Sequence, residues 1–388
     1  MNNFTYENRT KVCFGKGAAA QYLPGELAKY GNNVMLAYGG GSIKQNGVYN
    51  EMTEILKKAG KNIIEFSGIM PNPTYVKVQE GANLAKKHNV DLILAVGGGS
   101  VIDCCKIVSA QAKTEEDIWS MEFENHQFPN KFIPMGAIVT VAGTGSEMNA
   151  GAVITNEKQK VKAGIFGAQA DFAVLDYTYT MSVPIKQVIS GAFDTLSHAM
   201  ETYFGKPIEN NLSDDICEAV MRSVICNIRR LLKNPEDEFA RTELIWASSM
   251  AENGILKIGK VTDFQAHQIE HQLGAYTDCN HGFGLAVIHP VLYRHIYKDG
   301  IEKFVRFAKN VWGITDCETI DKTAIAGIES LADFIKEIGL PTTFAEMGIS
   351  ENTDFEAIAD SCNITAGCCK KLTHKEILNI LNECTKEE

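Results

Sequence analysis

The chain has 388 residues, of which 45% are hydrophobic and 22% are charged. This length predicts two or three domains, and the composition excludes an intrinsically disordered chain. The net charge of −11 argues against nucleic acid or an anionic membrane as the main partner, although a local basic pocket for phosphate remains compatible with it.

The first eight residues lack the basic region and apolar run of a signal peptide. No stretch reaches the roughly 18 apolar residues that a membrane-spanning helix requires. The eleven cysteines are scattered and often fall in helical patterns, so they do not indicate a disulfide framework. We therefore expect a cytoplasmic protein whose partners include neither a membrane nor a nucleic acid.

Short apolar runs alternate with amphipathic stretches of helical length in the first half of the chain. The predicted strands are 34–37, 63–66, 92–96, 133–139 and 172–175, and helices are predicted at about 46–59 and 75–88. This alternation is typical of βαβ units with a parallel sheet. After Pro184 long helical patterns take over, such as 214–232 and 236–256. The sequence thus predicts an α/β domain of the nucleotide-binding type over 1–183 and a mostly helical domain over 184–388.

Three glycine-rich segments are candidates for binding phosphate groups. The segment 15–20 matches G-x-G-x-x-A, but no long apolar strand precedes it, so a structural turn is the preferred interpretation. The segment 97–100 follows a predicted strand and opens a helix that carries Asp103, so backbone amides and the positive end of a helix dipole coincide there. A tight structural turn is the alternative, although three consecutive glycines make it entropically costly.

The third segment, 143–147, follows the strand that ends at Thr140 and combines hydroxyl groups with backbone amides. Because this turn and 97–100 follow successive strands, they imply one ligand that lies across the carboxyl edge of the sheet. The candidate binding residues in these two turns are Gly97, Gly98, Gly99, Ser100 and Thr144.

A further glycine-rich loop, after the strand 34–37, bears on the choice of nicotinamide cofactor. It consists of Gly39, Gly40, Gly41, Ser42, Ile43 and Lys44. An NAD-specific site commonly presents an acid here to the ribose hydroxyls, and that acid would repel a 2′-phosphate. The loop has no acid, and its small residues, hydroxyl and lysine leave room for the phosphate. The sequence therefore favours NADP(H) over NAD(H).

Acidic and histidine side chains recur at helical spacing in the second half. Asp194 and His198 are four residues apart, which places a carboxylate and an imidazole on one helix face, and His267 and His271 repeat the spacing. His281 follows in a segment typical of a loop. One carboxylate with three imidazoles suits Fe²⁺ or Zn²⁺, with a position left open for a substrate.

Two other interpretations of these histidines stay open. A single histidine on a helix is more often a hydrogen-bonded structural residue, although two pairs and a third cluster reduce the weight of that reading. The segment 267–271 also matches H-x-x-E-H, the inverted zinc-peptidase signature. A peptidase would need no phosphate-binding turns and would leave Asp194 and His198 unexplained, so it is the lesser hypothesis.

With these residues in view, the chain resembles the iron-containing (group III) alcohol dehydrogenases, and within them the NADPH-linked butanol dehydrogenase and aldehyde reductase branch. The resemblance runs from about residue 4 to the C-terminus. The motifs that carry it are Pro71-Asn72-Pro73-Thr74, the segments 97–103, 142–147 and 191–201, the pair His267 and His271, and Asn280-His281-Gly282.

The resemblance implies a Rossmann-like N-terminal domain with a parallel sheet and a helical C-terminal domain, as in the dehydroquinate synthase-like fold, and a homodimer. It implies that the metal ligands are Asp194, His198, His267 and His281, with His271 in the substrate site but not a ligand. It implies that Asp103, Thr140 and Lys162 line the nicotinamide side, and that Tyr179 and Thr180 meet the adenine end. The expected reaction is hydride transfer between nicotinamide and a small aldehyde or primary alcohol.

Two further functions serve as alternatives to this expectation. A related fold carries out a metal-dependent lyase reaction on a sugar phosphate, but the helical domain has no obvious basic cluster near the ligands for that substrate. A catalytically silent binding protein would keep the glycine loops without a complete metal site. Cys279, beside His281, is an oddity to which the sequence assigns no role.

Overall fold

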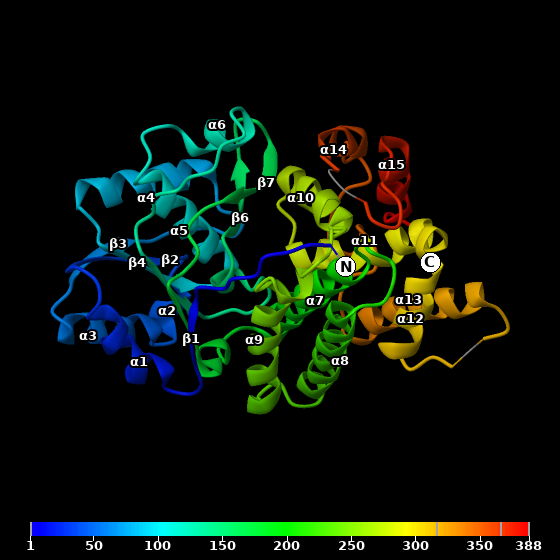
Figure 1. Cartoon of the computed structure of the whole chain (residues 1–388), viewed down its shortest axis with the longest axis horizontal. Coiled ribbons are helices and arrows are strands. Elements are labelled where there is room, and N and C mark those ends of the chain that lie inside the picture. Colours follow the sequence, from blue (N-terminus) through cyan, green and yellow to red (C-terminus); the bar gives the residue numbers. More distant parts are fainter. Residues whose placement is uncertain (1, 316, 365–366, 387–388) are drawn as a thin grey trace. The chain divides into compact units, whose positions relative to one another are not determined.

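The computed structural model describes residues 2–315, 317–364 and 367–386, and the chain divides into two compact units (Figure 1). One unit is Glu7–Pro184, and the other combines the segment up to Tyr6 with everything from Ile185 onward. The first unit is α/β and the second is helical, which confirms the predicted fold class. Among the described residues, we find no helix both long and apolar enough to cross a membrane.

The α/β unit is built on a six-stranded parallel sheet with the order β1-β8-β5-β4-β2-β3. Its strands are β1 Lys11–Phe14, β2 Asn33–Tyr38, β3 Asn62–Phe66, β4 Leu92–Gly97, β5 Met135–Val139 and β8 Phe172–Leu175. Because helices cover both faces, the central strands are apolar throughout, and all of Leu92–Val96 is fully buried. A separate antiparallel hairpin, β6 Gly151–Asn156 and β7 Val161–Phe166, was not expected from the sequence.

Helices pack on the two faces of this sheet (Figure 1). The helices of the unit are α1 Ala18–Leu27, α2 Ser42–Gln45, α3 Val48–Lys58, α4 Tyr75–Lys87, α5 Gly99–Gln111 and α6 Ile118–Phe123. Apolar side chains of α1 and α3 share a core with Val34, Leu36 and Tyr38 of β2. On the opposite side α4 and α5 meet closely, because Gly81 leaves space for Phe66 and Val108. Because all six strands are parallel, their carboxyl ends lie at the same edge of the sheet, and so do the loops that follow them.

The helical unit surrounds one extensive apolar core. Its helices are α7 Ile185–Tyr203, α8 Leu212–Lys233, α9 Glu238–Glu252, α10 Gln265–Thr277, α11 His281–Ile296, α12 Ile301–Asn310, α13 Ile320–Glu337, α14 Phe355–Ser361 and α15 His374–Glu383. Short 3-10 turns are η1 Ser146–Met148 and η2 Tyr177–Thr180 in the first unit, and η3 Ile255–Lys257 and η4 Tyr297–Gly300 in the second. Every residue of α7 from Ala192 to Tyr203 is buried, so polar side chains on this stretch must find partners inside the protein.

Candidate active site

Three helices of the helical unit bring the expected metal ligands together. Asp194 and His198 lie one turn apart on the buried stretch of α7, His267 lies in the first turn of α10, and His281 is the first residue of α11. Asp194 Oδ1 is 3.4 Å from His198 Nδ1, 3.5 Å from His267 Nε2 and 3.5 Å from His281 Nε2. One carboxylate oxygen thus lies within 3.5 Å of three imidazole nitrogens.

These atoms fit a divalent metal ion. Atoms bound to one Zn²⁺ or Fe²⁺ at 2.0–2.1 Å in a tetrahedron lie about 3.4 Å apart, close to the spacing observed here. Asp194 Oδ1, His198 Nδ1 and His267 Nε2 are also buried without a hydrogen bond to any described residue. Buried polar atoms rarely lack partners, so their convergence indicates a site built for a cation.

Two buried carboxylates hold the imidazoles from behind. Glu201 accepts a short hydrogen bond from His267 Nδ1, and Glu270 accepts a short one from His281 Nδ1. Because Nδ1 is the donor in each pair, Nε2 of each ring is left as the atom that faces Asp194. Both carboxylates are at most 1% exposed, and neither was expected from the sequence. The sequence does contain a signal for Glu201, because a residue three positions after His198 lies on nearly the same face of a helix.

The first turn of α11 approaches its neighbours closely because it contains two glycines. A Cβ at Gly282 would lie 2.4 Å from the backbone oxygen of Ser190 on α7, and one at Gly284 would lie 2.8 Å from Cγ of Glu270. Asn280 caps the helix by accepting the amide of Phe283 at 3.1 Å, and it also accepts the Ser190 hydroxyl at 2.7 Å. The Asn-His-Gly motif therefore fixes where His281 stands.

The pKa values of this cluster are shifted in different directions. Burial would raise the pKa of Asp194, but His198 and His281 outweigh it and hold that pKa well below its usual range. Burial would lower the pKa of His267, but Glu201 outweighs it and raises that pKa to about 10. Burial would also lower the pKa of His281, but Glu270 and Asp194 outweigh it and raise that pKa, whereas burial lowers the pKa of His198. Two of the three imidazoles therefore lie in a field that stabilises positive charge, which a divalent cation supplies.

His271 lies beside this cluster but outside the Asp194 set. Its ring centroid is 6.0 Å from that of His267 and 5.5 Å from that of His281. His271, Glu270 and His281 also lie close enough to form a second set of potential metal-holding groups. Because Glu270 is fully buried and engages His281, the H-x-x-E-H segment does not present it as the water-activating base of a peptidase.

The glycine-rich loops of the α/β unit meet at the carboxyl edge of its sheet. Segment 39–42 follows β2, Gly97 ends β4, and Thr140 follows β5, and these three strands are neighbours. Thr140 is tied to this edge by its amide, which donates to Gly97 O at 3.0 Å. Of the expected binding residues at this edge, Gly97 ends β4, Ser42 opens α2, and Gly99 and Ser100 open α5. The others lie in the loops, namely Gly39, Gly40, Gly41, Gly98, Thr140 and Thr144.

The glycines at 97–99 serve both packing and ligand access. A Cβ at Gly97 would lie 2.5 Å from Val101, and one at Gly99 would lie 2.5 Å from the Thr144 hydroxyl, so the two loops touch through glycine. Gly98 precedes α5 without a side-chain cap from the described residues. The first amides of α5 are therefore oriented to donate hydrogen bonds to an anion such as a pyrophosphate.

The other expected cofactor residues take varied positions within the unit. Asp103 is buried and accepts hydrogen bonds from the Ser146 hydroxyl and the Val153 amide, so it braces the 143–153 segment against α5. Lys162 is buried on β7. Tyr179 and Thr180 lie buried in η2, and Tyr179 belongs to the apolar core beside α1 and α3.

One acid near the cofactor loop was missed. The segment 39–44 contains no carboxylate, but Glu65 of β3 lies 3.8 Å from Lys44 Nζ and accepts hydrogen bonds from Tyr38 and Tyr49. The absence of an acid within the loop therefore does not mean that no carboxylate lies beside it. Glu65 is distant in sequence and comes near only because β3 pairs with β2.

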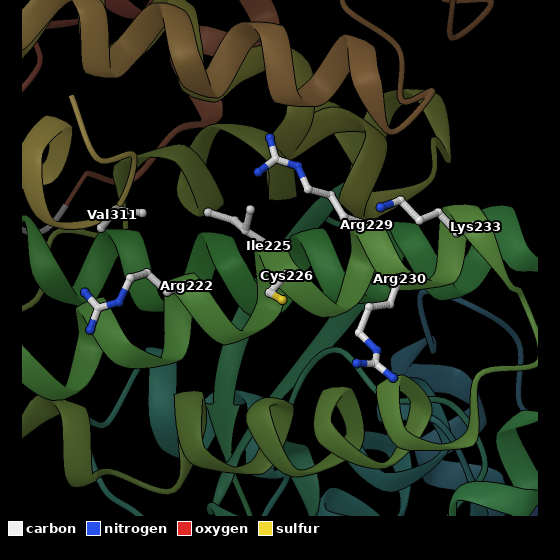
Figure 2. Close-up of a pocket in the computed structure, with 7 residues that line it drawn as sticks. All are labelled: Arg222, Ile225, Cys226, Arg229, Arg230, Lys233 and Val311. Carbon is white, nitrogen blue, oxygen red and sulfur yellow. The ribbon is translucent and has the colours of Figure 1, made fainter.

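A pocket of about 360 Å³ along α8 is separate from these sites (Figure 2). Basic side chains line it, yet Arg229 forms a two-point ion pair with Glu337, and Arg230 pairs with Asp237 at 2.9 Å. Their charge is therefore largely compensated. The pocket contains none of the converging acidic and histidine side chains, so the chemistry lies elsewhere.

The α/β unit has a parallel sheet with glycine loops at its carboxyl edge, and the helical unit has an Asp-His₃ set that is buried apart from the partly exposed His281. These features define a metal-dependent, nucleotide-using class of protein. Family models described as "Iron-containing alcohol dehydrogenase" and "Fe-containing alcohol dehydrogenase family, C-terminal" match residues 9–177 and 188–385. The chain belongs to the iron-containing alcohol dehydrogenase family.

Similar proteins of this family carry names that differ in cofactor. The chain is 38% identical to the probable NADH-dependent butanol dehydrogenase 1 of Bacillus subtilis, over 98% of this chain and 99% of that protein. It is 35% identical to the NADPH-dependent aldehyde reductase YqhD of Escherichia coli, over 90% of each chain. The crystal structure of an NADH-dependent butanol dehydrogenase A from Thermotoga maritima matches with a TM-score of 0.94 and 34% identity, over 100% of this chain and 99% of that one.

Replacing Asp194 with Ala should lower the affinity for Fe²⁺ or Zn²⁺ at least about 100-fold, because it removes the one charged donor of the set. Metal content after dialysis and competition with a chelator would measure the loss. Asp215→Ala is the matched control, since that carboxylate is exposed and pairs with Arg306 on the surface. A variant Asp194→Ala that keeps its metal and activity would contradict the ligand assignment.

Glu270→Leu should lower metal affinity by about 10–100-fold, because His281 loses the acceptor that orients its ring. Glu270→Gln should retain most of the affinity, since its amide oxygen can still accept from Nδ1. Chelator competition on both variants separates orientation from packing. Equal losses of metal affinity in the two variants would show that the hydrogen bond from His281 to residue 270 does not support metal binding.

Proposed function

We propose that the protein interconverts small uncharged aldehydes and primary alcohols, with NADP(H) as the hydride carrier and one divalent ion, Fe²⁺ or Zn²⁺, in the Asp194 site. The observation that carries this proposal is the convergence of one carboxylate and three imidazoles at 3.4–3.5 Å in a member of this family. The names of the butanol dehydrogenase and aldehyde reductase relatives support the substrate class.

In this proposal Asp194, His198, His267 and His281 hold the ion, which would supply Lewis acidity toward a carbonyl or alkoxide oxygen. Glu201 and Glu270 keep two of the imidazoles in the orientation and tautomer needed for binding. The protein need only orient the substrate carbon and the nicotinamide C4 for hydride transfer.

The glycine loops and the amide end of α5 would bind the pyrophosphate, with Ser100 and Thr144 near it. We assign the nicotinamide side to Asp103, Thr140 and Lys162, and the adenine end to Tyr179 and Thr180. The contacts of Asp103 support an indirect role in cofactor binding, because its carboxylate accepts hydrogen bonds from Ser146 and Val153 and so positions the segment that carries them.

NADP(H) is the cofactor that the loop 39–42 favours, because the loop is free of carboxylates and Lys44 follows it. The neighbouring carboxylate of Glu65 weakens this preference for NADP(H). Because similar proteins are named for either NADH or NADPH, a small number of residues can decide which cofactor is preferred. We also propose a homodimer in the cytoplasm, from the family resemblance and the sequence alone.

The first experiment follows the absorbance of the reduced nicotinamide with butanal, comparing NADPH with NADH. Each assay is run after chelation and again after anaerobic addition of Fe²⁺ or Zn²⁺. We expect metal-dependent oxidation of NADPH, and the Asp194→Ala variant serves as the inactive control. Nucleotide binding without turnover on any aldehyde or metal would favour the lyase or the silent binding protein.

His271 is the candidate that relays the proton of the alkoxide. His271→Ala should lower turnover by about 10²-fold or more with metal content unchanged, since general acid–base groups contribute on that scale. His126→Ala, at an exposed position, is the control. Loss of metal from His271→Ala would instead make this residue a ligand.

A further inference from the structure

We propose that Glu65 sets the balance between NADPH and NADH by acting as the counter-ion of Lys44 at the glycine loop 39–42. This inference rests on the proposed function, because it assumes that the loop receives the adenosine ribose of the cofactor. It assigns a specificity-determining role to a residue outside that loop.

Glu65 is the centre of a compact polar group next to the loop. Its two oxygens accept hydrogen bonds from the hydroxyls of Tyr38 at 2.6 Å and Tyr49 at 2.5 Å. Lys44 Nζ lies 3.8 Å from Glu65 Oε2 and above both tyrosine rings, 5.1 Å from the Tyr38 centroid and 4.6 Å from the Tyr49 centroid. The ammonium group is thus held between two aromatic faces and one carboxylate.

The pairing of β2 with β3 ties this group to the loop. Leu36 of β2 is in register with Glu65, and Tyr38 is the last residue before the glycines. After β3 the chain stays beside the loop, because the Gly68 amide donates to Gly39 O at 3.1 Å. A ligand group held by the loop amides therefore meets Lys44 and Glu65 together.

Both members of the pair are charged at neutral pH. The hydrogen bonds from Tyr38 and Tyr49 lower the pKa of Glu65, and the contact with Tyr38 raises the pKa of Lys44. The side chains are 45% and 50% exposed, so the pair adds little to stability and can respond to a ligand.

The charges act in opposite directions on a 2′-phosphate. Lys44 attracts the phosphate, whereas Glu65 repels it and also holds part of the ammonium charge away from it. A cofactor with a free 2′-hydroxyl experiences no such repulsion and can donate to an anionic acceptor instead. Removing the charge of Glu65 should therefore favour the phosphorylated form selectively.

The test measures binding of adenosine 2′,5′-bisphosphate and of 5′-AMP by calorimetry, without catalysis. In Glu65→Gln the ratio of affinities should shift toward the bisphosphate by about tenfold, as expected for one charge beside a phosphate near a protein surface. Lys44→Gln should shift it the opposite way. Glu54→Gln is the matched control, because Glu54 forms an exposed pair with Lys58 on α3. High salt should shrink both shifts.

An unchanged ratio in Glu65→Gln, with both probes still bound, would overturn the inference whatever Lys44→Gln does, and it would leave the proposed function intact. Failure of the wild-type protein to bind either probe would instead refute the proposed nucleotide site. Because the Glu65 side chain is 45% exposed, Glu65→Gln is expected to fold, and Lys44→Gln shows separately how much the lysine contributes. NADPH and NADH titrations of the same variants should follow the fragment ratios.

Discussion

The burial of Asp194 is the constraint on which the helical unit depends. A carboxylate removed from water is strongly unfavourable unless positive charge or hydrogen bonds surround it. Here three imidazoles converge on one of its oxygens, and two of them are in turn held by Glu201 and Glu270. The arrangement requires α7, α10 and α11 to meet at one place, so the packing of the three helices and the convergence of the four side chains depend on each other.

In the α/β unit the dominant constraint is close approach of backbone at one edge of the sheet. Parallel strands end at one edge, and the glycines after β2 and at the end of β4 keep side chains out of that space. Where a Cβ would strike Val101 or Thr144, the glycines are also required for contact between loops. Packing therefore requires glycine in segment 97–99, where we also propose that the pyrophosphate binds.

Much of this could be predicted from the sequence, because the signals are local. The apolar runs with helical stretches between them indicated the sheet, and the four-residue spacing of Asp194 and His198 indicated a shared helix face. The ligand set itself was predicted only through resemblance to a family, since periodicity alone does not say which imidazoles converge.

What could not be predicted depends on contacts between distant segments. Glu65 reaches the cofactor loop through the β2–β3 register, and Glu270 reaches His281 through the docking of α10 on α11. The β6–β7 hairpin was missed because its short strands are only half apolar and lie between stronger signals. A search of the loop alone for an acid could not have found a carboxylate on the adjacent strand.

The close approach of Gly284 to Glu270 has an evolutionary consequence. Any side chain at 284 would collide with the glutamate, so that position is confined to glycine for as long as residue 270 is long. A lineage that shortens residue 270 releases position 284 at the same step, whereas the reverse order passes through a clash beside His281. The two positions should therefore covary across divergent sequences. A side chain larger than glycine at 284 should occur only together with a short residue at 270.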